Sequence, residues 1–178
     1  MAQAKRKKRF FDVEIPSIRK ETQLQAYEIE ELEGKLMIYD LTRILRGKNM
    51  TLQLKVKIKD GKAVAIPRQV QLLSSFLKRM VRKGTNYVED SFSTKCKDAQ
   101  IRIKPFLVTR RKVSRAIRKA LREKAKEELT KYVEEKDTEK IFDEILSNQL
   151  QKTLSLKLKK IYPLSVCEIR VLKVEKEL

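Results

Sequence analysis

A strict alternation of apolar and polar residues over 51–59 (TLQLKVKIK) is the clearest regular pattern in the chain. The apolar side of this segment consists of Leu52, Leu54, Val56 and Ile58. A period of two is typical of a half-buried antiparallel strand. Asp60 and Gly61 then form a preferred type I′ turn pair, so 62–66 (KAVAI) is predicted to return as the second arm of a hairpin. The lysines on the outer side of the strand fit a solvated face as well as they fit phosphate contacts.

Weaker patterns of the same kind predict further strands at 10–15, 24–29, 35–39, 86–95, 99–108 and 166–174. A helix is predicted to begin at Pro67 and to end before Gly84, because apolar residues recur there at the spacing of one buried stripe. The stripe consists of Val70, Leu73, Phe76, Leu77, Met80 and Val81. Arg79, Arg82 and Lys83 would complement the negative end of this helix, a structural role that needs no ligand.

Apolar residues at every fourth position from Val113 to Val133 predict a long amphipathic helix. Basic residues are concentrated just before this helix and in its first half, where Glu123 is their only acidic neighbour. They are Arg110, Arg111, Lys112, Arg115, Arg118, Lys119, Arg122, Lys124 and Lys126. The helix dipole prefers cations at the opposite end, so it does not explain this placement. The pattern therefore favours an external anion as the partner of these residues.

The charge reverses from 127 to 144, where eight acidic residues face three lysines. These acids either meet a basic neighbouring protein or simply keep the helix soluble, and the second interpretation is favoured. Further helices are predicted at 138–146 and 149–160. A strand is the alternative for 149–160, because Leu154, Leu156 and Leu158 alternate there.

The overall charge indicates that the protein binds a polyanion. The chain has 178 residues with 43 Lys and Arg against 24 Asp and Glu, which gives a formal net charge of +19. Hydrophobic residues make up 41%, enough for one core, so we expect a single α+β domain over 10–178. Residues 1–9 form a basic arm that contains Lys5, Arg6, Lys7, Lys8 and Arg9 and no acid. Such a block repels itself, so we expect it to be flexible and to order on a partner.

The absence of histidine removes most enzyme mechanisms from consideration. Cys96 and Cys167 lie far apart and are interpreted as small semi-buried residues, and no glycine-rich phosphate loop occurs. Glu33-Gly34-Lys35, with Asp12, imitates a metal-dependent nuclease motif, but a turn is the favoured interpretation. No apolar run reaches the ~18 residues of a membrane helix, and no signal peptide is recognisable. We therefore expect a soluble non-enzyme in a reducing compartment, without cofactor, metal, membrane or small-molecule substrate.

Nucleic acid is the polyanion that the clustered arginines favour. Arginine forks grip phosphate bidentately, which gives strong, salt-dependent binding with no sequence preference. Aromatic residues make up only 6% of the chain and Trp is absent, so a platform for stacking bases is not expected. Phe10 and Phe11 would more commonly pack on the sheet than stack on bases. Folded RNA, recognised by its shape and backbone, fits this composition better than single strands.

Four segments, in order, resemble one family. They are GKLMIYDLTRI at 34–44, FLKRMVRKGTNYVEDSF at 76–92, TRRKVSRAIRKALREKAKEEL at 109–129 and KKIYPLSVCEIRVLKV at 159–174. Together they resemble the small-subunit ribosomal protein family S3Ae (eS1) of archaea and eukaryotes, and most closely its archaeal members. Four matches in the right order are more specific than any single motif.

The resemblance implies an α+β fold in which an antiparallel, barrel-like β-sheet is flanked by helices. It also implies a structural, non-enzymatic constituent of the cytoplasmic small ribosomal subunit. The expected partners are small-subunit ribosomal RNA and neighbouring ribosomal proteins of the platform, near the messenger-RNA exit. The matching basic helix assigns Arg110, Arg111, Lys112, Arg115, Arg118, Lys119 and Arg122 to RNA, whereas the arm residues are assigned on charge alone. The alternative is a free, chromatin-like protein that binds RNA or DNA off the ribosome.

Overall fold

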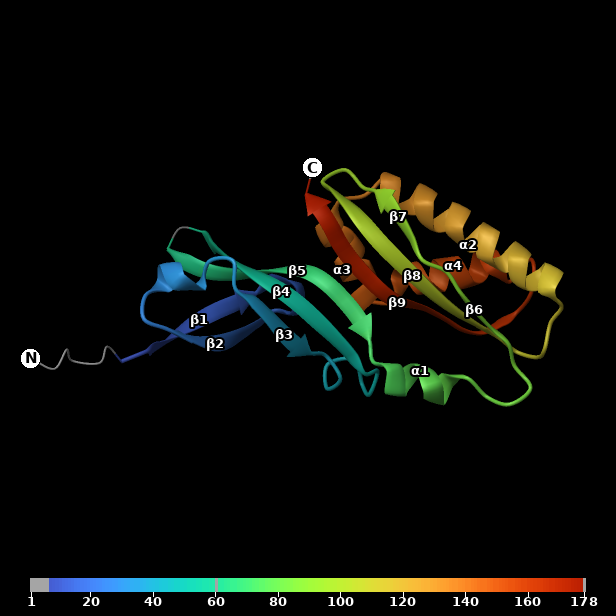
Figure 1. Cartoon of the computed structure of the whole chain (residues 1–178), viewed down its shortest axis with the longest axis horizontal. Coiled ribbons are helices and arrows are strands. Elements are labelled where there is room, and N and C mark those ends of the chain that lie inside the picture. The colour runs from blue at the N-terminus through green and yellow to red at the C-terminus, as the bar shows by residue number, and fades with distance from the viewer. Residues whose placement is uncertain (1–6, 60, 178) are drawn as a thin grey trace, which may run out of the picture. The chain divides into compact units, whose positions relative to one another are not determined.

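The computed structural model describes residues 7–59 and 61–177 and confirms the mixed α+β class (Figure 1). The chain divides into two compact units. The first contains the residues up to Tyr39 together with Leu52–Arg68, and the second contains Asp40–Thr51 and the residues from Gln69 onward. The sequence-based division into an arm and one domain stays a prediction.

The first unit is built from strands. β1 (Arg9–Ile15) and β2 (Lys20–Ala26) form an antiparallel hairpin, and β3 (Leu36–Asp40) pairs with β4 (Met50–Lys59). These strands confirm the predictions at 10–15, 35–39 and 51–59, whereas the strand predicted at 24–29 begins and ends earlier. The apolar side chains of β4 point into the core as the sequence pattern predicts, because Leu52, Leu54 and Val56 are fully buried.

The strand after β4 confirms the predicted return of the chain at 62–66. β5 (Lys62–Leu72) pairs with β4, and Ala63 and Ala65 are buried on it. Of the two residues predicted to form the turn, Asp60 lies outside the described residues. Gly61 has a φ of 74°, the left-handed conformation that favours glycine.

The helix predicted from Pro67 is wrong over its first half. β5 continues to Leu72, and α1 covers only Ser74–Met80. Val70 and Leu72 are buried and alternate with half-buried glutamines, a period of two that overlaps the helical spacing on which the prediction rested. Pro67 falls between the residues of β5 that pair with β1 and those that pair with β9.

The second unit holds a sheet centred on β8 (Ala99–Thr109). β6 (Tyr87–Glu89) and β7 (Phe92–Lys95) pair with one side of β8, and β9 (Leu164–Glu177) pairs with the other, all antiparallel. Shifts of register interrupt the β8–β9 ladder, one of them at Lys104/Pro105, where proline has no N–H to donate. The strands predicted at 86–95, 99–108 and 166–174 are confirmed, the first as two short strands.

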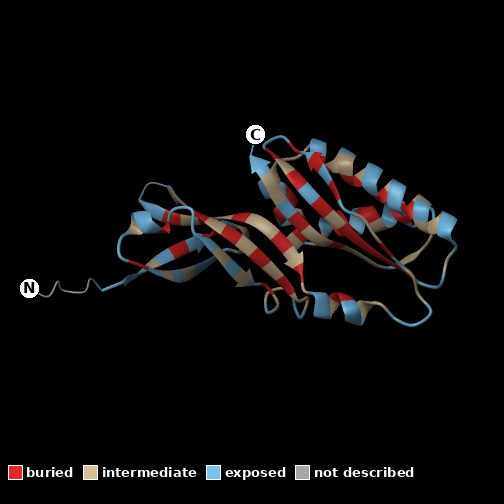
Figure 2. Cartoon of the chain, viewed as in Figure 1, coloured by how far each residue is buried: buried red, intermediate tan, exposed pale blue. Residues whose placement is uncertain are grey.

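Three helices complete this unit: α2 (Arg115–Glu134), α3 (Thr138–Leu146) and α4 (Gln149–Leu158). α2 contacts β6 and β7, α4 contacts β9, and α3 packs on α4. Each helix buries one apolar stripe, and that of α2 shows as red patches between pale blue and tan parts of its ribbon (Figure 2). For 149–160 the helix is correct and the strand alternative is wrong. Leu154 and Leu158 are buried one turn apart, whereas Leu156 between them is 70% exposed.

The strands described pair in an open order, β2-β1-β5-β9-β8-β6, with β3 joined through β4 and β7 joined to β8. The barrel-like closure expected from the family resemblance is therefore not what these pairings form. The expected antiparallel pairing also has an exception, because β1 and β5 are parallel, with Val13 opposite Ala63. Three strands and their connections separate β1 from β5 along the chain, which gives the backbone room to return in the same direction.

Candidate nucleic-acid interface

The basic arm is described in part. Lys7 and Lys8 are exposed, and Arg9, also exposed, is the first residue of β1. Lys5 and Arg6 lie outside the described residues. The ammonium group of Lys8 lies 5.7 Å from the centre of the Tyr27 ring, so this lysine already has a neighbour within the first unit. The assignment of the arm to RNA stays a prediction.

The three basic residues before α2 are carried on a backbone segment that hydrogen bonds fix in place. The Thr109 hydroxyl accepts a hydrogen bond from the Asn86 backbone N–H (3.0 Å) and donates one to the Arg111 carbonyl oxygen (2.7 Å). The Asn86 side-chain oxygen accepts from the Val113 backbone N–H (2.8 Å). The segment is therefore tied at both ends, and the side chains of Arg110, Arg111 and Lys112 are exposed on it.

The start of α2 adds positive charge to the same place. Ser114 caps the helix by accepting a hydrogen bond from the Ile117 backbone N–H (3.4 Å), and the first turn contains no acidic residue. The helix dipole contributes partial positive charge at this end. The basic side chains and the dipole therefore reinforce one another instead of cancelling.

The basic and apolar residues of α2 lie on different faces. Leu121, Ala125, Leu129 and Val133 are buried against the rest of the second unit. Arg115, Lys119 and Arg122 are exposed, whereas Arg118 is half-buried and its Nε is enclosed without a hydrogen-bond partner among the described residues. The exposed members are therefore the stronger candidates for phosphate contacts.

The acidic half of α2 is neutralised by lysines of the same unit. Glu127 pairs with Lys131 (2.7 Å) and Lys124 (3.0 Å), and these bonds lower the pKa of the Glu127 carboxyl to about 2. Glu128 accepts from Lys157 of α4 (2.5 Å), and Lys124 lies 3.1 Å from it on the other side. These two acids therefore hold α2 to α4 and to its own lysines, a role that neither interpretation of the acidic stretch had included.

Another acidic residue of the 127–144 stretch is used in the same way. Glu144 of α3 accepts from the Tyr132 hydroxyl (2.7 Å) and from Lys136, whose ammonium group also lies over the Tyr132 ring. Burial is the largest influence on the pKa of the Lys136 ammonium and acts to lower it, but the bonds to Glu144 and Tyr132 outweigh it and raise that pKa.

From Arg110 to Arg122, the described residues show no comparable compensation. Within the described part of the chain, no carboxylate pairs with Arg110, Arg111, Lys112, Arg115 or Arg122. Lys119 has one contact, with Glu123 at 3.8 Å between two largely exposed side chains. Exposed pairs of this kind contribute at most ~1 kcal/mol. The result is a patch of uncompensated positive charge, which we call the basic patch and define as Arg110, Arg111, Lys112, Arg115, Lys119 and Arg122.

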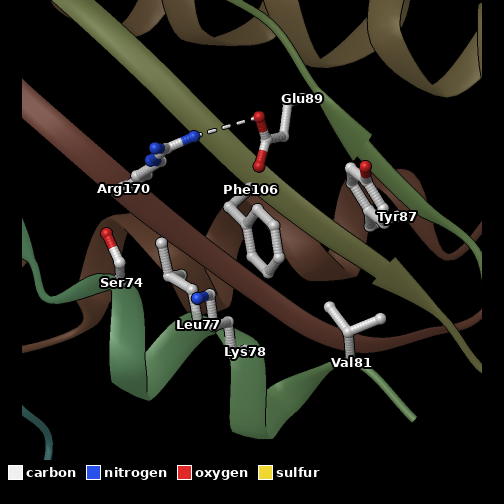
Figure 3. A pocket seen from close by; sticks show the side chains of 8 residues that line it. All are labelled: Ser74, Leu77, Lys78, Val81, Tyr87, Glu89, Phe106 and Arg170. Carbon is white, nitrogen blue, oxygen red and sulfur yellow. Dashed lines mark hydrogen bonds and ion pairs between the residues drawn. The ribbon is translucent and has the colours of Figure 1, made fainter.

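A groove of about 470 Å³ lies in the second unit between α1 and the sheet (Figure 3). Its apolar walls include Leu77 and Val81 on one side and Tyr87 and Phe106 on the other. The two aromatic rings are stacked, with centroids 6.1 Å apart and planes 24° from parallel. Tyr87 is 55% exposed, whereas Phe106 is 3% exposed. The solvent-exposed Tyr87 ring therefore stacks on a buried ring, that of Phe106.

Sequence reasoning missed this groove because it treated 67–83 as one helix. With α1 ending at Met80, Arg82 and Lys83 lie in the loop after it, so they do not serve its dipole as predicted. Only Lys78 and Arg79 are in its last turn. The alternation of Gln69 and Gln71 with Val70 and Leu72 is the signal that would have placed the end of β5 correctly.

The residues considered for catalysis or metal binding form no recognisable metal site among the described residues. Glu33 and Lys35 flank a turn in which Gly34 has a φ of 77°, and among the described residues no group of three or more Cys, Asp or Glu is arranged to hold a metal ion. Cys96 and Cys167 are unpaired thiols, and burial followed by the neighbouring Glu168 charge raises the pKa of Cys167 to about 12. In the ranges 7–59 and 61–177, no helix has the length and apolar character needed to cross a membrane.

Comparison with known proteins decides the family. The model of the Ribosomal S3Ae family matches residues 2–177. The chain belongs to this family. Proteins named small ribosomal subunit protein eS1 are among the relatives of this S3Ae member. That of Pyrobaculum arsenaticum is 29% identical over 168 residues, which cover 93% of this chain and 74% of the relative.

Two further eS1 relatives give the same result. The protein of Pyrobaculum aerophilum is 29% identical over 177 residues, covering 95% of this chain and 80% of its own length. The protein of Nanoarchaeum equitans is 27% identical over 168 residues, which cover 89% of this chain and 84% of the relative. All three organisms are archaea, so the resemblance recognised in the sequence is confirmed, including its archaeal type.

Proposed function

We propose that this chain is a structural constituent of the small ribosomal subunit in the cytoplasm and binds small-subunit ribosomal RNA through phosphate contacts. The contacts are made by the basic patch, with Arg118 beside it, and by the arm residues Lys5 to Arg9. The chain helps to hold the platform of the subunit near the messenger-RNA exit, beside neighbouring ribosomal proteins. It carries out no reaction of its own.

The observation that carries this proposal is the uneven compensation of charge along α2. Acidic residues of its second half are paired with lysines of α2 and α4, whereas the basic patch has a single weak contact to a carboxylate among the described residues. A helix that only needed to stay soluble would gain nothing from unpaired arginines at its positive end. Family membership and the names of the relatives support the ribosome as the place where the anion is found.

Cosedimentation tests the proposal. A tagged chain is expressed in an archaeal host, and the lysate is separated on sucrose gradients at low and at raised salt. We expect the chain in the small-subunit fraction at both salt concentrations, because many phosphate contacts and protein neighbours act together. Recovery only in free fractions, or on DNA, would overturn the proposal and favour the chromatin-like alternative.

A matched pair of variants locates the contact surface in the same experiment. Arg111→Gln, Arg115→Gln and Arg122→Gln together remove three charges from the basic patch. The control removes three exposed lysines elsewhere in the second unit, Lys95, Lys152 and Lys173, also to Gln. We expect the first variant to leave the subunit at lower salt than the wild type and the control to stay bound like the wild type.

A further inference from the structure

We propose that the groove between α1 and the sheet, the α1 groove, binds an unstacked RNA base on the ring of Tyr87. This inference rests on the proposed function for the kind of RNA that meets the chain, but it concerns a different surface from the basic patch. It also revises the expectation that a chain so poor in aromatic residues has no stacking site. One well-placed ring is enough for one base.

The aromatic wall is the first support. Tyr87 of β6 and Phe106 of β8 lie on the same face of the sheet, and the Phe106 ring points toward α1 (Figure 3). Phe106 is buried and stacks against the Tyr87 ring, while more than half of the Tyr87 residue stays open. Leu77 and Val81 supply apolar surface across the groove. A flat ring facing an apolar wall is the geometry that accepts a splayed-out base.

The charge around the groove is the second support. The stretch 74–87 carries Lys78, Arg79, Arg82 and Lys83 and no acid, and all four are exposed. Lys78 lines the groove, and the loop with Arg82 and Lys83 connects two lining residues, Val81 and Tyr87. Lys78 therefore belongs to the groove wall, and Arg82 and Lys83 lie in the loop between two lining residues, where they can meet the phosphates on either side of a bound base.

The polar end of the groove is the third support. Arg170 of β9 donates a hydrogen bond to Glu89 of β6 (3.1 Å), and both side chains are 38% exposed. The pair leaves guanidinium N–H donors and carboxylate lone pairs at the rim beyond those used in this bond. Base edges present both acceptors and amino donors, so this pair is able to read an edge while the ring holds the face.

A nucleotide fits these features better than an apolar segment of a neighbouring protein. An apolar segment would fill the groove without using Lys78, Arg82 and Lys83. A nucleotide neutralises them with its phosphates and covers the aromatic wall with its base. The occupant is therefore assigned by charge complementarity as well as by shape.

Oligonucleotide binding by the full chain tests the inference. The chain has no tryptophan, so Tyr87→Trp places a single fluorescent reporter in the groove. The probes are hexameric oligoadenylate, hexameric oligouridylate and a base-free polyphosphate of matched charge. We expect the hexamers to quench the reporter by stacking and the polyphosphate to bind without quenching. Equal quenching by polyphosphate, or none by either hexamer, would overturn the inference.

A matched pair of leucine variants measures the contribution of the ring. Tyr87→Leu keeps apolar volume and removes the aromatic face, and Phe10→Leu does the same at an exposed ring of the first unit, 64% exposed. We expect Tyr87→Leu to weaken hexamer binding by about 5- to 100-fold and to leave polyphosphate binding unchanged. Phe10→Leu should change hexamer binding by less than about twofold. Equal losses in both variants would show that the groove has no special role.

The two proposals fail separately. A chain that stays off the small subunit but loses hexamer affinity with Tyr87→Leu would refute the ribosomal role and keep the groove. A chain that cosediments with the subunit, but whose hexamer affinity is the same for the wild type and for Tyr87→Leu, would refute the groove and keep the ribosomal role. If Tyr87→Leu weakened cosedimentation without any effect on hexamers, a protein segment would be the occupant and the inference would be wrong.

Discussion

Asn86 and Thr109 show how two uncharged residues position a charged segment. Two of their hydrogen bonds tie 109–113 to the loop before β6, and a third, from the fully buried Thr109 to the Arg111 carbonyl, holds the segment internally. Neither residue stands out in the sequence, because an isolated Asn or Thr is common in loops. The basic residues were recognisable from charge alone, whereas the side chains that hold them in place became visible only in the structure.

Replacing Asn86 tests this positioning. Asn86→Ala leaves the Val113 N–H without its partner, so we expect the free energy of unfolding to fall by about 1–3 kcal/mol. RNA affinity should fall as well, although no charge is removed. Thermal unfolding and filter binding measure the two effects. Gln23→Ala, which removes an exposed hydrogen bond to Asp12, is the control and should change neither. Unchanged unfolding and RNA affinity in Asn86→Ala would contradict this account of the segment.

Glu127 gives a residue-scale test of the internal pairing in α2. Hydrogen bonds from Lys131 and Lys124 lower its pKa from 4.5 to about 2. A carboxyl whose pKa is depressed by folding contributes stability that is present above about pH 4.5 and is lost as the pH falls toward 2. Carboxyl-carbon NMR should show a midpoint near 2 for Glu127. Lys131→Gln should raise this midpoint, and Lys140→Gln, which removes a lysine paired with Asp137 instead, should not.

Sequence patterns predict a helix or strand well where one period dominates and poorly where two periods overlap. The β4 strand, α2 and α3 have one dominant period each, and the structure places them where that period predicts. The segment 67–83 has two overlapping periods, because Val70, Leu73 and Leu77 fit a helix while Val70 and Leu72 fit a strand. Tertiary pairing with β9 decides in favour of the strand, and this pairing involves residues about 100 positions away. The α1 groove could not be predicted from the sequence, because the two periods of 67–83 left the start of α1 undecided.

The edge strand β3 leads to a prediction about the isolated chain. Among the pairings described, β3 has β4 as its partner, and its Leu36 and Ile38 are 61% and 73% exposed. An exposed apolar edge favours pairing between copies of a chain. We expect Ile38→Lys to reduce concentration-dependent self-association of the purified protein, measured by analytical ultracentrifugation. Leu156→Lys, at a position 70% exposed on α4, should have a smaller effect. An equal effect of both variants would show that hydrophobicity alone, and not the strand edge, causes association.

At the scale of the whole molecule, the net charge of +19 describes the chain less well than its distribution does. Glu128 and Glu144 join α2 to α4 and to α3 through Lys157 and Tyr132, whereas the basic patch has one weak contact to a carboxylate among the described residues. The polarity of α2 and the family were predictable from the sequence. Which charges are already satisfied was not, because lysines such as Lys157 reach their acids only through helix packing.

The salt dependence of RNA affinity tests the central claim, that the basic patch contacts phosphate. Binding of the full chain to small-subunit ribosomal RNA is measured from low to high salt for the wild type, for Arg111→Gln with Arg115→Gln and Arg122→Gln, and for the Lys95, Lys152 and Lys173 control. Each lost phosphate contact reduces the slope of log affinity against log salt by about 0.7–0.9. We expect a slope lower by about 2–3 for the arginine variant and an unchanged slope for the control. Equal slopes for all three proteins would contradict the claim.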